Sequence, residues 1–225
     1  MRLFFLTIGL VLLLGQSVFA QKKRERLDMA MFNLNYNYLL NSQGQFKQRF
    51  YSHGFDFTLM YDHIMSQKAP ISIGVGLGVS SMHFFTDANL VNIDTTQGTY
   101  STFVPIDTAL SNIKRSRFTT NYYEIPVELR FRTNPEDEDK HPWKFAIGAK
   151  LGFRINSRDK LIDEDGYRVI DSKYPNTSRV RGIGTVRIGY GKVALYGAYQ
   201  FSSLFHENQG VELYPISVGL NISLF

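Results

Sequence analysis

The residues of this chain with the most versatile chemistry are five histidines, His53, His63, His83, His141 and His206. A structural zinc site takes about four histidine or cysteine ligands at short, regular spacings. The histidines show no such spacing, and the chain has no cysteine. We therefore expect them in loops or at interfaces, and we predict no metal site and no cofactor.

Two serine–histidine pairs could take part in nucleophilic catalysis, which needs a serine, a base and an acid that orients the base. Ser52 directly precedes His53, and Ser203 lies three residues before His206. Neither pair belongs to a recognisable catalytic motif with an acid. We therefore predict no catalytic residue and a protein that is not an enzyme.

The glycines Gly74, Gly76 and Gly78 have the wrong spacing for a dinucleotide-binding loop. They lie instead within the stretch Ile71–Ser80, where apolar residues alternate with glycine or serine. Strict alternation is typical of a strand with two different faces. A face with almost no side chains suits a small barrel, in which the wall bends sharply and the interior is crowded.

The same alternation recurs along the chain and predicts eight strands. Their expected bounds are about Ala30–Tyr38, Phe50–Ile64, Ile71–Phe84, Phe118–Arg132, Trp143–Asn156, Arg179–Tyr190, Val193–Leu204 and Val211–Phe225. Pro126 removes a hydrogen-bond donor from the fourth strand, so we expect a β-bulge there. In the sixth strand the alternation is weakest, because Gly182 and Gly184 share a face with valines.

Length and composition are consistent with one domain in residues 29–225, after a signal peptide in residues 1–20 and a short periplasmic segment in residues 21–28. No later apolar run approaches the roughly 20 residues that a membrane-spanning helix needs. A chain that spans a membrane must then do so with strands. We predict an all-β fold, an eight-stranded antiparallel up-and-down β-barrel in the bacterial outer membrane. A secreted soluble barrel with an apolar interior is the alternative.

The expected connections alternate between short turns and longer loops, as in bacterial outer-membrane barrels. Two segments, Thr86–Ser116 and Ser157–Ser178, show no sustained period and are predicted to be long extracellular loops. Their apolar residues could pack on one another or on a partner. Alternatively, these segments extend the strands above the membrane and shield the barrel mouth.

Charged residues of both signs fall on the inward face of the predicted strands. The acids are Asp56, Asp62, Glu124 and Glu128, and the bases are Arg130, Arg132, Lys144, Lys150, Arg154, Arg181 and Arg187. Unpaired charge in a narrow lumen would be costly. If Arg132 lies opposite Pro142 or Trp143, Glu124 comes close to Lys150. We predict a structural ion pair between Glu124 and Lys150 that helps to plug the lumen.

Four segments resemble the small outer-membrane barrels of Bacteroidota, known as PorT-type or porin-family proteins. They are Tyr122–Arg132, Lys144–Asn156, Arg187–Phe205 and the ending Pro215–Phe225. The resemblance implies a barrel domain whose last strand is recognised by the outer-membrane insertion machinery. Some members of the family serve type IX protein secretion, and some other eight-stranded outer-membrane barrels edit lipid A.

The formal charge of +5 is spread along the chain, which argues against nucleic acid as a partner. We expect contacts with outer-membrane lipids and lipopolysaccharide, a monomeric barrel, and an envelope protein as a possible partner. The expected function is structural, binding or scaffolding, with the interaction surface in the extracellular loops. The alternatives are an accessory part of a type IX secretion apparatus and a lipid A-editing enzyme.

Overall fold

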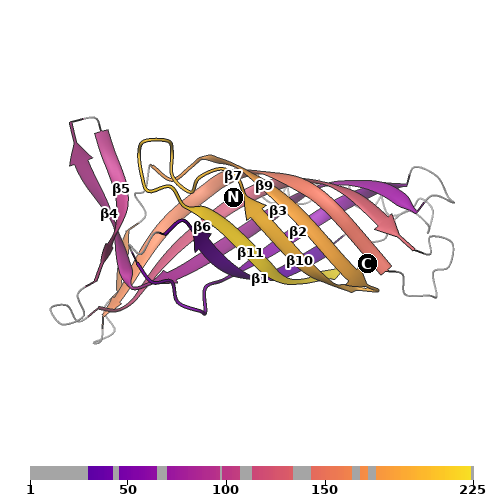
Figure 1. Cartoon of the computed structure of the whole chain (residues 1–225), viewed down its shortest axis with the longest axis horizontal. Helices are drawn as coiled ribbons and strands as arrows, with labels where there is room; N and C mark the ends of the chain where they lie inside the picture. Colours follow the sequence, from indigo (N-terminus) through magenta and orange to yellow (C-terminus); the bar gives the residue numbers. More distant parts are fainter. Residues whose placement is uncertain are drawn as a thin grey trace, which may run out of the picture.

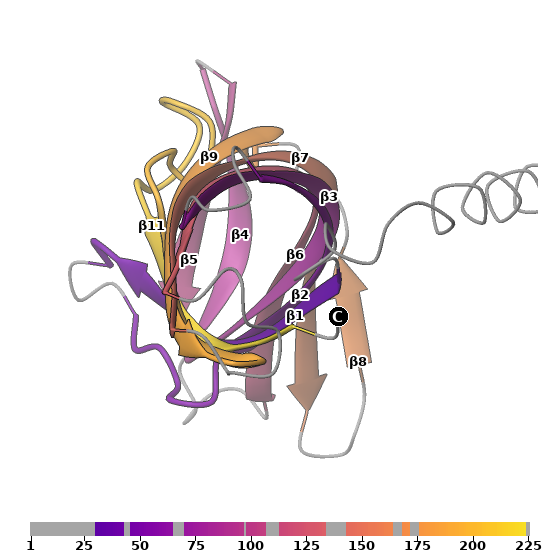
Figure 2. The same ribbon diagram turned by 90° about the vertical axis from the view of Figure 1, so that its right-hand side faces the viewer.

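A computed structural model describes residues 30–42, 46–64, 70–96, 98–106, 113–133, 143–163, 168–171 and 176–223. Within these residues, eight antiparallel strands close into a barrel, drawn side-on in Figure 1 and end-on in Figure 2. They are β1 (Ala30–Leu40), β2 (His53–Ile64), β3 (Ile71–Thr86), β6 (Ile113–Arg132), β7 (Trp143–Asp163), β9 (Val180–Tyr190), β10 (Val193–Gln200) and β11 (Tyr214–Ser223). The predicted eight-stranded barrel is confirmed. The proposed signal peptide, residues 21–28 and Phe225 lie outside the described residues.

Successive barrel strands pair with one another, and β1 pairs with β11 to close the ring. This seam runs from Met31 opposite Ser223 to Leu40 opposite Tyr214. On its inner face the Asn221 amide donates a 2.6 Å hydrogen bond to Asn33 Oδ1.

The described residues contain no helix that is long and apolar enough to cross a membrane.

The barrel has apolar side chains outside and polar ones inside. Leu77 and Leu195 point outward and are 67% and 65% exposed, whereas Arg130 and Arg181 point inward and are 2% and 1% exposed. A soluble barrel has the opposite arrangement, so this distribution fits a bilayer around the barrel and a polar interior. The soluble alternative is therefore wrong.

Exposed aromatic pairs lie at both edges of the outward apolar band. Trp143 packs edge-on against Tyr190, with ring centroids 5.6 Å apart, close to the turn at Gly191 and Lys192. Tyr123 lies opposite Phe153 near the other edge. Aromatic belts at the two membrane interfaces are typical of outer-membrane barrels. We call the end with Gly191 and Lys192 the turn end, and the opposite end the loop end.

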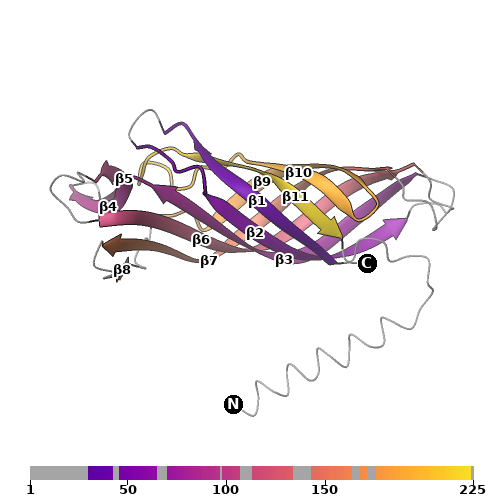
Figure 3. The same ribbon diagram turned by 90° about the horizontal axis from the view of Figure 1, so that it is seen from below.

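Both segments predicted to be long loops contain strands at the loop end (Figure 3). In the first, β3 continues to Thr86, a hairpin of β4 (Ala88–Thr95) and β5 (Gly98–Pro105) follows, and β6 begins at Ile113. In the second, β7 continues to Asp163 and pairs with β8 (Arg168–Asp171). The two segments do connect barrel strands at the loop end, but the expectation that they lack regular strands is wrong, because the alternation reverses above the apolar band. There Phe84 and Phe118 point inward and are fully buried. The polar residues Arg117 and Thr119, which alternate with the buried positions of β6, are more exposed.

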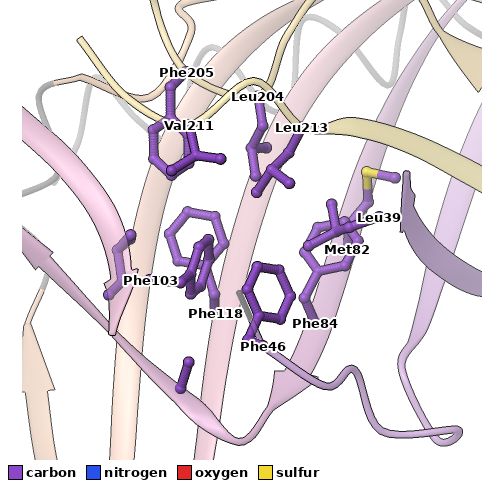
Figure 4. Packing of buried hydrophobic residues seen from close by; sticks show 12 residues of the cluster. Leu39, Phe46, Met82, Phe84, Phe103, Phe118, Leu204, Phe205, Val211 and Leu213 are labelled. Atoms are coloured by element: carbon purple, nitrogen blue, oxygen red, sulfur yellow. The ribbon is translucent and has the colours of Figure 1, made fainter. Parts of the chain in front are cut away.

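The last two strands are shorter than predicted. β10 ends at Gln200 and β11 begins at Tyr214, so the intervening segment 201–213 connects them at the loop end. Its residues Leu204, Phe205, Val211 and Leu213 are buried in a hydrophobic cluster (Figure 4). This packing removes them from the barrel wall.

The bulge expected at Pro126 is absent from the described strands. Pairing of β3 with β6 is interrupted opposite Pro126, but Val75 with Val127 and Gly78 with Glu124 keep one register. A register shift lies instead between Asn121 and Tyr122, where β6 pairs with β7. The barrel therefore tolerates the missing donor as a local gap in the ladder.

Candidate functional site: a filled lumen and a cleft at the loop end

Near the turn end, two carboxylates in the lumen each contact two arginines. Asp62 contacts Arg132 and lies 3.5 Å from Arg130 Nη1. Glu128 Oε2 lies 2.9 Å from both Arg130 Nε and Arg187 Nη2. These charges come from β2, β6 and β9, so the ion pairs cross the lumen and connect separate parts of the wall.

At mid-height Lys150 lies between two carboxylates. Its Nζ is 3.0 Å from Glu124 Oε2 and 3.3 Å from Asp56 Oδ2, and it lies 5.2 Å from the ring centroid of Tyr196. The structure thus brings together the two residues of the predicted ion pair. The expected register was wrong, since Arg132 pairs with Lys144 and Glu124 with Gly152, and Lys150 reaches Glu124 diagonally.

Arg181 lies on the loop-end side of this charged layer and links Glu124 to Tyr122. Its guanidinium contacts Glu124 and the Ser80 hydroxyl, and its central carbon lies 3.8 Å from the ring centroid of Tyr122. The Tyr122 hydroxyl donates a 3.1 Å hydrogen bond to the Ser178 carbonyl oxygen. A cation–π contact of this kind orients the guanidinium as well as stabilising it.

Side chains fill this charged part of the lumen. A cavity of only about 20 Å³ remains between Asp56, Glu124, Lys150, Arg181 and their neighbours. That volume is about the size of one water molecule. Eight strands leave an interior that side chains can fill, and here they do so.

An apolar cap closes the lumen above the charged layers (Figure 4). Its buried side chains come from barrel strands, from the connection between β1 and β2, from the β4–β5 hairpin and from segment 201–213. They are Leu39, Phe46, Met82, Phe84, Ala88, Leu90, Phe103, Phe118, Leu204, Phe205, Val211 and Leu213. Leu90 and Phe103 of the hairpin point into this cap, as the hypothesis of a shielded barrel mouth requires. The cap therefore forms a second, apolar core outside the bilayer.

An open cleft of about 580 Å³ lies beside the cap at the loop end. Its walls come from segment 201–213, from Tyr100 on β5, from Tyr214 on β11 and from the strand connections near Asn41 and Ser178. Polar side chains dominate the lining, which also includes Ser202, Ser203, His206, Glu207, Asn208 and Glu212. A cleft of this size can hold a small molecule.

The structure places the two predicted serine–histidine pairs differently. Ser52 is fully buried, and its hydroxyl accepts a hydrogen bond from the Phe85 amide, while His53 Nδ1 lies 2.8 Å from the Tyr51 carbonyl oxygen. These bonds hold the pair in structural roles. Ser203 and His206 both line the cleft.

The histidines form no metal site among the described residues, which contain no group of three or more potential ligands; His141 lies outside them. His83 lies beyond the apolar band, four residues past Val79, which pairs with Tyr123 at the band edge. Its ring packs near His53 and within 3.0 Å of the Thr119 hydroxyl. Burial, with added repulsion from Arg117 and His53, lowers the pKa of His83 to about 4.

Apart from Ser203 and His206, the residues that line the cleft were not predicted as site residues from the sequence. One local signal was available, because the polar run His206–Gly210 interrupts two apolar pairs, Leu204–Phe205 and Val211–Leu213. Such a pattern is typical of a tight loop anchored at both ends. Asn208 adopts a left-handed conformation with φ of 60°, which asparagine tolerates well.

Comparison with known proteins identifies a family and a solved structure with a similar chain course. The family model described as "Outer membrane protein beta-barrel domain" matches residues 19–208. A solved structure of Ail, the attachment invasion locus protein of Yersinia pestis, in complex with the heparin analogue sucrose octasulfate, is 12% identical. That match covers 86% of this chain and 95% of Ail, with a TM-score of 0.32. No curated protein sequence matches the chain.

Proposed function

This chain belongs to the family of outer membrane protein β-barrel domains, and we propose that it acts in that membrane as a closed platform whose extracellular end binds a partner. The proposed role is recognition or scaffolding, without catalysis. Lipids and lipopolysaccharide surround the apolar band, and the partner is another envelope component.

The filled lumen is the observation that supports this proposal most directly. Ion pairs occupy the lumen at the turn end and at mid-height, and the apolar cap closes the lumen at the loop end. Solute passage would require both layers to open together. Meanwhile the β4–β5 hairpin and the long ends of β6 and β7 exceed the short turns that barrel closure needs. Structure beyond that minimum supports a binding role at the loop end.

A shortened variant tests this proposal. Replacing the β4–β5 hairpin (Ala88–Pro105) by an Asn-Gly turn should abolish a partner that is cross-linked to the wild-type barrel in intact outer membranes. A control barrel with the same Asn-Gly insertion at the Gly191–Lys192 turn should keep that partner. Heat-modifiable mobility in gels would report correct insertion of both variants. Retention of the partner by the shortened barrel would contradict the proposal.

Conductance and surface labelling test the two geometric premises of the proposal. The wild-type protein should show no steady conductance in a planar bilayer. Because the chain has no cysteine, single cysteines can be introduced at Thr96 in the hairpin turn and at Lys192 in the β9–β10 turn. An impermeant thiol reagent should label whole cells through Thr96→Cys and not through Lys192→Cys. The reverse labelling pattern would show that the turn end faces outward and would refute the proposed orientation of the barrel.

We propose cleavage of the signal peptide after Ala20, from the basic start, apolar run and small residues of the first twenty positions, and a monomeric barrel. The resemblance to PorT-type barrels of Bacteroidota adds the proposal that the insertion machinery recognises the last strand. An accessory role in type IX secretion would appear as co-purification with that apparatus in mild detergent. For a barrel without catalysis, lipid A mass spectra of a deletion strain should match those of the parent strain.

A further inference from the structure

We propose that the cleft at the loop end binds a short saccharide that carries hydroxyl or amino groups but no acidic groups. This inference rests on the proposed function and adds a ligand class to it. It follows from three properties of the cleft: its fixed walls, its unused polar groups and the sign of its charge.

The walls of the cleft are fixed on both sides. The Ser101 amide donates a 2.9 Å hydrogen bond to the Gln209 carbonyl oxygen, and the His206 amide donates one of 2.8 Å to Asn176. The buried Phe205 and Val211 side chains anchor the same loop in the apolar cap. A cleft that is shaped before binding spends less of its binding energy on ordering.

Several polar groups in the lining are available to a ligand. Ser203, His206, Glu207 and Glu212 make no side-chain hydrogen bond or ion pair within the described part of the chain, although each lines the cleft. Together they offer hydroxyl, imidazole and carboxylate groups, which can donate to or accept from sugar hydroxyls. Half-buried Tyr100 and Tyr214 add aromatic rings with an apolar face and a polar end. This mixture suits a polyhydroxylated ring better than an apolar ligand.

The charge of the lining selects among saccharides. Two of its thirteen described residues, Glu207 and Glu212, carry carboxylates, and none is lysine or arginine. Sulfated, phosphorylated and uronic sugars would meet repulsion without a compensating cation. An amino sugar would gain a charge-assisted hydrogen bond from either carboxylate. The cleft therefore favours amino sugars over neutral sugars, and neutral sugars over acidic ones.

Titration of the full barrel in detergent micelles with three defined probes tests this order. The probes are a β-1,4-linked glucosamine tetramer, its fully N-acetylated neutral form and a chondroitin sulfate tetrasaccharide. Calorimetry or saturation-transfer NMR should detect the first two and not the third, with tighter binding of the glucosamine tetramer. Equal or tighter binding of the sulfated probe would overturn the proposal, and so would failure of both other probes to bind at millimolar concentration.

Variants assign the binding to this cleft. The double change Glu207→Gln/Glu212→Gln should weaken binding of the glucosamine tetramer about tenfold, as expected for loss of charge-assisted hydrogen bonds, and leave the neutral tetramer within twofold. Asp94→Asn removes a carboxylate at the hairpin tip, outside the lining, and should change neither affinity. Tyr214→Ala should weaken both tetramers, whereas Tyr214→Phe retains the ring and should bind both. Unchanged affinities in the double variant and in Tyr214→Ala would place the site elsewhere.

The result is separable from the test of the proposed function. None of these variants alters the length of the β4–β5 hairpin, which the partner experiment removes. If no saccharide binds while the cross-linked partner still depends on the hairpin, the ligand class is wrong and the platform role stands. If saccharides bind and the partner is independent of the hairpin, the platform role as proposed fails.

Discussion

Arg181 lies over the ring of Tyr122, with its guanidinium carbon 3.8 Å from the ring centroid, where the charged lumen meets the apolar cap. Arg181 also contacts Glu124, and the Tyr122 hydroxyl reaches the Ser178 carbonyl oxygen. Arg181 Nη1 also lies 2.8 Å from Sδ of Met82, a residue of the apolar cap, so Arg181 joins the ion pairs to the cap. Loss of either layer should therefore disturb the other.

The first prediction concerns Tyr122. Tyr122→Phe keeps the aromatic ring under Arg181 and loses one buried hydrogen bond, so the free energy of unfolding should fall by about 1 kcal/mol. Tyr122→Leu also loses the aromatic face and should cost about 1 to 2 kcal/mol more. Urea unfolding of the barrel in lipid vesicles, followed by the fluorescence of Trp143, the single tryptophan, measures both. Equal losses in the two variants would show that the cation–π contact contributes nothing.

The second prediction concerns Lys150. Lys150→Met leaves the carboxylates of Glu124 and Asp56 without their shared ammonium group, which should cost about 3 kcal/mol in a dry lumen. The double variant Lys150→Met/Glu124→Gln should regain part of that loss. Lys192→Met, on the exposed turn, is the matched control and should unfold like the wild type. A Lys150→Met barrel with wild-type stability would mean that water solvates the lumen.

The third prediction concerns Gly76, in the alternating stretch of β3. A Cβ at this position would lie 2.3 Å from the Leu59 carbonyl oxygen and 2.5 Å from the Met60 sulfur. Since the oxygen belongs to the backbone of the paired strand, Gly76→Ala must move that strand and should cost about 1 to 3 kcal/mol. At Gly197 a Cβ would meet only the Val186 side chain, at 3.2 Å. Gly197→Ala should therefore be tolerated better, and equal losses would refute the steric argument.

The fourth prediction is a pH dependence that originates at His83. Its folded pKa of about 4 lies below the ordinary value of 6.5, mainly because of burial. Between these values the unfolded chain binds more protons, so the stabilising contribution of neutral His83 is complete above about pH 6.5 and is lost as the pH falls toward 4. His83→Gln should show a smaller slope of unfolding free energy in this window. Identical slopes in variant and wild type would exclude His83 as the origin.

The barrel itself could be predicted because the bilayer imposes one rule on every spanning strand. Apolar residues must alternate with lumen residues, as they do from Ile71 to Val79, and β9 is the instructive exception. Its weak pattern arises at Gly182 and Gly184, where the Phe201 ring lies so close that a Cβ would come within about 3.2 Å and 3.0 Å of it. Phe201, the first residue of segment 201–213, thus covers the positions that lack side chains.

The loop end could not be predicted because that rule stops at the edge of the apolar band. Beyond it water surrounds the strands, so Phe84 and Phe118 point inward, which reverses the polarity of the pattern. The cap also assembles side chains from distant segments, such as Leu39 and Leu213, which no local period relates. The cleft was missed for the same reason, since Tyr100 and Tyr214 come to line one cleft only through tertiary contacts.

The seam between β1 and β11 joins the two ends of the barrel sequence. Asn33 and Asn221 share a hydrogen bond across the seam and are separated by 188 residues in the sequence. Each of the other barrel pairings joins two barrel strands that are consecutive in the sequence. Closing so long a segment costs chain entropy that local hairpins do not incur. The inner amides of β1 therefore remain without these partners until β11 is in place. Until then β1 presents an unpaired, amide-rich edge of the kind that sheet proteins must protect from wrong pairing.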